Sequence, residues 1–259
     1  MESKIEESAR ALFDAEQKRV PIAPLSETYP GLTPEQAYAI QGILMEMKGR
    51  AGTRLVGHKI GLTSLAMQQQ IGVDQPDYGV LLDSMVVPSG ATLAHADFIA
   101  PRIEPEIAFW LAQDVRGPGV TAEDVLAATR AVCAALELVD SRIASWRIKL
   151  VDTIADNASS ARVIVSERTM DLEALDLVAE HVTLLRNDEV VGSGYGSAVL
   201  GHPAAAVAWL ANKLSEFGVG LQAGQLVLPG AMCAAAPVVA GATYRASFEH
   251  LGDVTIRFA

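Results

Sequence analysis

The chain has 259 residues and a formal charge of −11 at neutral pH, from 31 acidic and 20 basic residues. Half of the residues are hydrophobic, which is enough to bury a core and excludes a largely disordered chain. The acidic balance excludes the basic surface that binds nucleic acid or an anionic membrane. We therefore expect neither nucleic acid nor a membrane as a partner.

The cysteine content and the N-terminus narrow the class of protein. Two cysteines, Cys133 and Cys233, are too few for a disulfide framework or a four-cysteine zinc site. The first twenty residues are polar with a helical period, and they lack the apolar stretch of a signal peptide. Pro and Gly interrupt the later apolar runs, so no membrane span is predicted. These features predict a soluble, cytoplasmic, globular protein.

Two helices are predicted at the start of the chain. The first carries one apolar face. The second begins with a capping signal, in which Thr33 precedes Pro34 and Gln36 is the reciprocal partner of the cap. Gly49 is its expected end. We therefore predict a helical N-terminal segment over residues 1–54.

From Leu55 onward the pattern changes to short β-type runs separated by turn residues. The expected strands cover 55–62, 79–87, 103–111, 135–140, 161–166, 181–187, 189–194, 225–228, 243–250 and 253–259. Helices are expected over 121–132 and from Pro203 to Gly218. Because strands and helices do not alternate regularly, a doubly wound parallel sheet is disfavoured. The prediction is an α+β fold in which residues 55–259 form a large mixed, mainly β body, with one catalytic unit overall.

Three glutamates stand in apolar strand contexts. Glu104 and Glu106 are two residues apart in one predicted strand, so both point to the same face, and Glu137 lies in another apolar run. Buried carboxylates are costly unless they are paired, protonated or bound to a cation. An oxygen-ligated divalent cation, Mg²⁺ or Mn²⁺, would satisfy all three. Spacing alone leaves open the alternative that each glutamate is exposed or ion-paired, for example with Arg102 or Arg142.

Two other segments carry polar groups that chemistry could use. Lys59 stands in an apolar strand closed by Gly61, where it could neutralise a bound carboxylate or transfer a proton. The alternative is a lysine whose stem covers apolar surface while its ammonium reaches water. The small polar residues of 152–159 either line a pocket or form a turn and a helix cap, and their types favour the cap. The glycine-rich run 192–196 lacks the lysine of a phosphate loop and is interpreted as a strand turn.

Seven segments in this order resemble the 2-hydroxypentadienoate hydratase and 4-oxalocrotonate decarboxylase family, within the fumarylacetoacetate-hydrolase-like superfamily. They are GHKIGLTS (57–64), IGVDQPDYGVL (71–81), PRIEPEIAF (101–109), ALELVDSRI (135–143), DTIADNAS (152–159), LGHPAAAVAWLANKL (200–214) and AGQLVLPGA (223–231). The resemblance spans nearly the whole chain. It implies that the β body is barrel-like and that the chain forms a symmetric homo-oligomer, a pentamer or decamer. A complex with a neighbouring enzyme of the same pathway is compatible with it.

The resemblance also implies a metal site. Glu104, Glu106 and Glu137 match the family's metal-binding carboxylates, with Mg²⁺ or Mn²⁺ as the expected cofactor. The substrate would be a 2-oxo or 2-hydroxy dienoic acid, which can chelate such an ion through its C1 carboxylate and C2 oxygen. Three carboxylates exceed the charge of one dication, so a nearby lysine would be needed to make an anionic ligand tolerable.

Four more residues receive roles by resemblance. Lys59 matches the active-site lysine and Asp77 matches an acidic residue, and both are expected to be catalytic. Ile71 falls where the family has an apolar pocket residue, usually leucine. Ser159 matches a serine that contacts the substrate carboxylate. Ile71 and Ser159 are therefore the expected substrate-binding residues.

The resemblance implies two activities of one degradation route, the meta-cleavage pathway of aromatic compounds. A hydratase adds water to 2-hydroxypenta-2,4-dienoate (2-keto-4-pentenoate) and gives 4-hydroxy-2-oxopentanoate. The alternative is decarboxylation of 4-oxalocrotonate (2-oxo-3-hexenedioate). The segments 196–203 and 223–238 favour the hydratase. An acylpyruvate hydrolase is disfavoured because its water-activating His-Glu pair has no convincing counterpart, and a non-catalytic partner subunit is disfavoured by the intact carboxylates.

Overall fold

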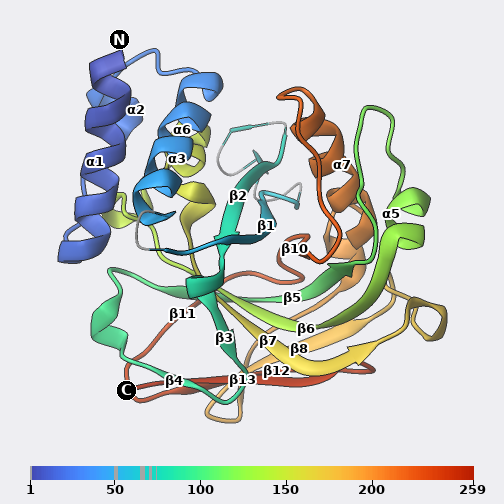
Figure 1. The fold of residues 1–259 in the computed structure, drawn as a ribbon. Coiled ribbons are helices and arrows are strands. Elements are labelled where there is room, and N and C mark those ends of the chain that lie inside the picture. Colours follow the sequence, from blue (N-terminus) through green and yellow to red (C-terminus); the bar gives the residue numbers. More distant parts are fainter. Residues whose placement is uncertain (1, 50–51, 65–67, 70–71, 74) are drawn as a thin grey trace.

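Three helices open the chain in the computed structural model, which describes every residue except 1, 50–51, 65–67, 70–71 and 74. They are α1 (Glu2–Lys18), α2 (Leu25–Thr28) and α3 (Pro34–Gly49). The predicted cap of α3 is confirmed, because Gln36 N–H donates to Thr33 Oγ1 and Thr33 N–H donates to Gln36 Oε1. Figure 1 shows these helices together on one side of the molecule, beside α6 (Leu150–Ala155).

The N-terminal helices share a hydrophobic core with a later part of the chain. Leu12 of α1 and Ile40 and Leu44 of α3 are fully buried in one cluster with Ile143 and Ile154. Ile154 belongs to α6, so this cluster attaches the helical segment to the β body. The boundary between 54 and 55 remains a prediction, since the two parts pack together.

Eight strands of the described chain form a larger sheet with the order β2-β1-β10-β5-β6-β7-β3, and β11 pairs with β5. Their bounds are β1 (Leu55–Gly61), β2 (Asp77–Leu82), β3 (Val86–Pro88), β5 (Arg102–Leu111), β6 (Thr129–Val139), β7 (Ser160–Met170), β10 (Leu226–Leu228) and β11 (Ala236–Pro237). The pairs β1–β10 and β3–β7 are parallel, and the others are antiparallel. The sheet is therefore mixed, as predicted, and Figure 1 shows that it curls.

A second sheet packs beneath the first, in the order β4-β13-β12-β8-β9. Its strands are β4 (Thr92–Leu93), β8 (His181–Arg186), β9 (Glu189–Tyr195), β12 (Thr243–Phe248) and β13 (Gly252–Phe258). Burial alternates along β12 and β13, which is the pattern of strands with one face on a core. Tyr244, Val254 and Phe258 lie on that inner face, in one cluster with Ile107 and Leu136 of the larger sheet. The main core thus fills the space between the two sheets.

Two further helices lie on the opposite side of the molecule from α1–α3 (Figure 1). They are α5 (Ala122–Ala128) and α7 (Pro203–Ser215). The predicted helix over 121–132 is wrong at its end, because β6 begins at Thr129 and residues 129–132 belong to it. Val132 is fully buried and pairs with Phe109 of β5, so sheet pairing overrides the helical period there.

Short 3₁₀ turns connect these elements at Asp83–Met85, His95–Asp97, Ala144–Trp146, Asn157–Ser159, Leu172–Ala174 and Gly196–Ala198. Among the described residues, no helix has both the length and the apolar character needed to cross a membrane. Helices and a mixed sheet in this order confirm the predicted α+β class.

Candidate metal centre

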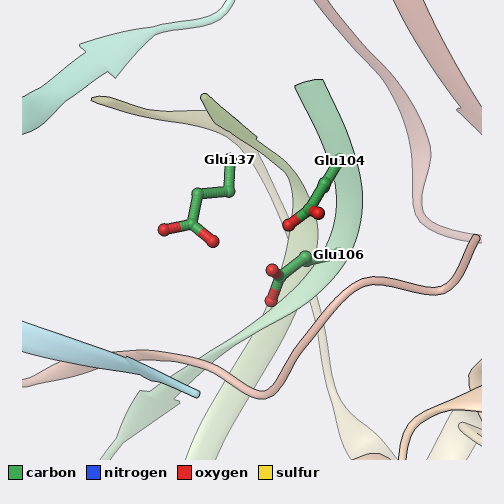
Figure 2. A group of neighbouring side chains, drawn as sticks. All are labelled: Glu104, Glu106 and Glu137. Atoms are coloured by element: carbon green, nitrogen blue, oxygen red, sulfur yellow. The ribbon is translucent and has the colours of Figure 1, made fainter. Parts of the chain in front are cut away.

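Three glutamates converge on one face of the larger sheet. Glu104 and Glu106 stand two residues apart on β5, and the backbone register pairs Glu104 directly with Glu137 of β6. One oxygen of each carboxylate lies within 4.8 Å of the others. Figure 2 shows the three side chains directed toward a common space. The structure thus brings together the three carboxylates that the sequence predicts as metal ligands.

Protein hydrogen bonds leave most of these oxygens unused. Glu106 and Glu137 are fully buried, and Glu104 is partly buried. Glu106 Oε2 accepts the Gly230 backbone N–H at 2.7 Å. Among the described residues, Glu106 Oε1 and Glu137 Oε1 have no hydrogen-bond partner, and the contact of Glu137 Oε2 is an ion pair with Lys59 Nζ at 3.1 Å. Buried carboxylate oxygens without partners are costly, so they point to a cation that would bind them.

Gly230 can donate to Glu106 because of its own backbone conformation. Its φ is +123°, and a Cβ at this position would lie 2.0 Å from Thr63 Oγ1. Only glycine fits there without strain. The hydrogen bond fixes Oε2 of Glu106 and leaves Oε1 facing the cluster, which is how outer contacts commonly orient a metal ligand.

Burial and mutual repulsion disfavour the charged forms of the glutamates. Burial, followed by the charge of Glu137, raises the pKa of Glu104 to about 7, against the opposing charge of Lys59. The same causes, burial first, raise the pKa of Glu106 well above its ordinary value. An oxygen-only donor set with excess negative charge suits a hard divalent cation such as Mg²⁺ or Mn²⁺. The residues present therefore fit the expected metal.

Lys59 of β1 lies beside this cluster. Its Nζ is 3.1 Å from Glu137 Oε2 and donates to the Ala158 carbonyl at 3.0 Å. Only 4% of the lysine side chain is exposed, so the alternative of an ammonium in water is wrong. Burial by itself lowers the pKa of Lys59, but the charges of Glu137 and then Asp77 outweigh it and raise the pKa above its ordinary value. The carboxylates around Lys59 therefore favour its charged form.

Asp77 begins β2, opposite Gly61 of β1. Its carboxylate is buried; Oδ2 accepts the Thr153 hydroxyl at 2.9 Å, and Oδ1 has no hydrogen-bond partner in the described part of the chain. Burial is the largest cause that raises the pKa of Asp77, against the opposing charge of Lys59. A buried carboxyl with one uncommitted oxygen can accept or donate a proton.

The two predicted substrate-binding residues have different outcomes. Ile71 lies outside the described residues. Ser159 is buried, and its hydroxyl donates to Asp156 Oδ2 at 3.3 Å. It follows Ala158, whose carbonyl binds Lys59, so it is next to the site in the chain. Its contact with a substrate carboxylate remains a prediction.

A left-handed turn places the Ala158 carbonyl. Asn157, Ala158 and Ser159 all have positive φ, between 48° and 54°, which costs energy in non-glycine residues. The Asn157 side chain holds the turn against β2, because it accepts from Val80 N–H at 2.7 Å and donates to the Val80 carbonyl at 3.0 Å. The interpretation of 152–159 as a cap alone was therefore incomplete.

Three groups at the site were missed by the sequence reasoning. They are the Thr153 hydroxyl, the Ala158 carbonyl and the Gly230 N–H. Thr153 stands in the polar segment that the sequence singled out, so its density of hydroxyls was the available signal. Backbone groups carry no sequence signal, and their roles depend on the tertiary fold.

Comparison with known proteins gives three findings. The family model described as fumarylacetoacetate (FAA) hydrolase C-terminal matches residues 59–259. The 2-hydroxyhexa-2,4-dienoate hydratase of Comamonas testosteroni is 44% identical over 256 residues, which cover 98% of this chain and 97% of the relative. The 2-keto-4-pentenoate hydratase of Burkholderia vietnamiensis is 43% identical over 257 residues, covering 99% and 98%. These relatives match over almost their whole length.

A solved structure is similar over the whole chain. It is the 4-oxalocrotonate decarboxylase from Pseudomonas putida complexed with magnesium and adipate, with a TM-score of 0.97 and 37% identity. The match covers 100% of this chain and 98% of the decarboxylase. It confirms the helical N-terminal segment that the sequence pattern predicted and the curled mixed sheet, in place of a closed barrel, in the β body that the resemblance implied.

Proposed function

The chain belongs to the fumarylacetoacetate hydrolase family, and we propose that it is a divalent-metal-dependent hydratase of 2-hydroxypenta-2,4-dienoate (2-keto-4-pentenoate). The observation that carries this proposal is the buried cluster of Glu104, Glu106 and Glu137 with Lys59 beside it. Relatives that match the whole chain at 43–44% identity are named hydratases of such dienoates. This supports the hydratase over the decarboxylase, whose structure is 37% identical.

The reaction adds one water molecule without oxidation or reduction. The 2-hydroxyl proton leaves, C5 gains a proton, and water then supplies a hydroxyl to C4 and a proton to C3. The product is 4-hydroxy-2-oxopentanoate. The protein must therefore stabilise negative charge at the C1 carboxylate and C2 oxygen while it moves protons along the carbon chain.

Glu104, Glu106 and Glu137 are the residues that would hold the metal. A bound Mg²⁺ or Mn²⁺ would supply an electrophile for the C1 carboxylate and C2 oxygen of the 2-oxo acid. The magnesium named in the decarboxylase structure supports this choice of cofactor. The oxygen-only donor set of the three glutamates supports it independently.

Lys59 and Asp77 have different roles in the proposed reaction. The charges around Lys59 keep it protonated, so it serves as a fixed positive charge that attracts the substrate anion and stabilises charge that develops on C2 oxygen. Asp77 has a raised pKa and an uncommitted oxygen, so it is the group that exchanges protons with the carbon chain. Ser159 remains the proposed contact of the substrate carboxylate.

Decarboxylation of 4-oxalocrotonate is the second candidate, favoured by the TM-score of 0.97 to a decarboxylase. A single assay separates the two. The purified protein with Mg²⁺ is incubated with 2-hydroxypenta-2,4-dienoate or 2-oxohex-3-enedioate, and ultraviolet absorbance and carbon dioxide are followed. We expect loss of the dienoate without carbon dioxide. Release of carbon dioxide from the dicarboxylate with no turnover of the dienoate would replace the hydratase by the decarboxylase.

We also propose that the chain assembles as a symmetric homo-oligomer larger than a dimer. Large apolar side chains on its surface support assembly, among them Val190 and Tyr195 of the edge strand β9, which are 61% and 54% exposed. Light scattering at micromolar concentration should give several times the chain mass of 27.4 kDa. A mass equal to one chain would refute the assembly.

A further inference from the structure

The Asp77 carboxylate has one committed oxygen and one uncommitted oxygen. Thr153 donates to Oδ2, whereas Oδ1 lacks a hydrogen-bond partner in the part of the chain described. Oδ1 lies next to the position that a Cβ of residue 61 would occupy, which is empty because residue 61 is glycine. A Cβ at this glycine would be 2.2 Å from Oδ1 and 3.6 Å from Lys59 Nζ. The uncommitted oxygen therefore borders the same small space as the Lys59 ammonium.

One side chain fixes the distance between the elements that carry Asp77 and Thr153. Gln41 of α3 is buried, and its Nε2 donates to the carbonyls of Tyr78 and Ile154 at 2.9 Å each. Tyr78 follows Asp77 on β2, and Ile154 follows Thr153 on α6. The amide thus bridges the two elements one residue away from the Thr153–Asp77 hydrogen bond.

The residue before Thr153 anchors α6 a second time. The Asp152 carboxylate accepts the backbone N–H of Ser26 at 2.9 Å, the Ser26 hydroxyl at 2.7 Å and the Lys149 N–H at 2.9 Å. Ser26 lies on α2, so the helix is bound to the N-terminal segment. Branching at Cβ limits the χ1 angle of a helical threonine to two main rotamers. The anchored backbone of α6 and the hydrogen bond to Asp77 thus fix the Thr153 hydroxyl in the absence of substrate.

We propose that Thr153 is a positioning residue for proton transfer: its hydroxyl occupies Oδ2 of Asp77 and so directs Oδ1 at the space between Gly61 and Lys59. The χ2 angle of an aspartate is broad and roughly two-fold, so the carboxylate alone has no strong preference for this orientation. The hydrogen bond supplies it. This inference rests on the proposed function, in which Asp77 exchanges protons with the substrate.

The test is a double-mutant cycle. Thr153→Val keeps the shape of the side chain and removes the hydroxyl, Thr153→Ser keeps the hydroxyl, and Asp77→Asn removes the proton-exchanging group. Thr129→Val is the matched control, because it removes a hydroxyl that donates to the Val125 carbonyl at 2.7 Å. Turnover of 2-hydroxypenta-2,4-dienoate, Mg²⁺ affinity and thermal stability are measured for each.

We expect Thr153→Val to lower kcat about 10- to 100-fold, the scale of a misplaced reacting group, with KM and Mg²⁺ affinity little changed. Thr153→Ser should restore most of kcat, and Thr129→Val should leave it unchanged. In the Asp77→Asn background, Thr153→Val should add no further loss of kcat, because Thr153 acts through Asp77. If Thr153 were only structural, Thr153→Val would lower kcat by the same factor in the wild-type and Asp77→Asn backgrounds. That result would overturn the proposal.

A crystal structure of Thr153→Val separates this inference from the proposed function. If the wild-type protein does not turn over the dienoate, the proposed hydratase activity is wrong. The orientation of Asp77 still decides whether Thr153 positions it. We expect the carboxylate to rotate away from the space over Gly61, and an unrotated Asp77 in the variant would refute the positioning role.

Discussion

Glu104 of β5 and Glu137 of β6 are direct cross-strand partners in the antiparallel ladder. Like charges in this position repel each other and destabilise a sheet. Glu106 adds a third carboxylate on the same face, and Lys59 offers a single positive charge. This repulsion supports the proposed metal site, because a bound cation would convert the repulsion into ligation.

Glu106→Gln should weaken metal binding without unfolding the protein. The glutamine can still accept the Gly230 N–H through its amide oxygen, while the charge that faces the cluster is lost. We expect at least about a tenfold loss of Mg²⁺ and Mn²⁺ affinity, the scale seen when contacts around a metal are disturbed. Isothermal titration calorimetry measures the affinity, and Glu173→Gln, which alters an exposed side chain, is the control. Unchanged affinity would exclude Glu106 as a ligand.

The contribution of Glu106 to the stability of the metal-free protein should decrease as pH rises. The pKa of Glu106 is raised in the folded state above its ordinary value of 4.5. The stability that the protonated carboxyl contributes is therefore complete below pH 4.5, and it is lost as the pH rises toward the raised pKa. Glu106→Gln lacks this titration. With chelator present, the Tm of Glu106→Gln relative to wild type should therefore increase between about pH 5 and about pH 8.

Saturating Mg²⁺ should raise the Tm of the wild type more than that of Glu106→Gln at high pH. The reason is that a ligand that binds only the folded state stabilises the protein with the higher affinity more. Chelation should also abolish turnover, and added Mg²⁺ or Mn²⁺ should restore it. Full activity in a verified metal-free preparation would contradict the metal site.

Lys59→Met should lower kcat by about 10² to 10³, the usual cost of losing one group that stabilises developing negative charge. Metal affinity should be retained, since the substitution removes a positive charge from the site. Lys48→Met is the matched control. Lys48 is a largely buried, ion-paired lysine outside the site, with its Nζ 2.5 Å from Glu16 Oε2, so Lys48→Met measures the stability cost of losing such a lysine. Near-normal kcat in Lys59→Met would show that another group stabilises the charge.

Gly61→Ala should reduce kcat at least about tenfold, because the new Cβ would lie 2.2 Å from Asp77 Oδ1 and must displace it. Gly42→Ala is the control for the same chemical change. Gly42 is exposed on α3 with no atom within 4 Å of a new Cβ, so alanine there should stabilise the helix by about 1 kcal/mol. Turnover and Tm are measured for both, and an active Gly61→Ala would show that Oδ1 need not occupy that space.

The sequence alone determined the elements that depend on local order. The Thr33–Gln36 cap was predictable because its two partners are three residues apart. Glu104 and Glu106 were predictable as neighbours because side chains alternate along a strand. The end of α5 was not predictable from the sequence, because the pairing of Val132 with Phe109 of β5 places residues 129–132 in a strand. The apolar strand around Lys59 made it a candidate but left a structural role open, whereas Asp77 was supplied only by the resemblance to a known family.

Only the tertiary structure decided which of these residues meet. Lys59 and Glu137 lie on strands three steps apart in the order β1-β10-β5-β6, which in a flat sheet is about 14 Å. Their charged groups are nevertheless 3.1 Å apart, because the sheet curls and brings β1 over β6. Register and curvature arise from the packing of the whole sheet against the second sheet and the helices. They are properties of the assembled core, and no segment of the chain contains them by itself.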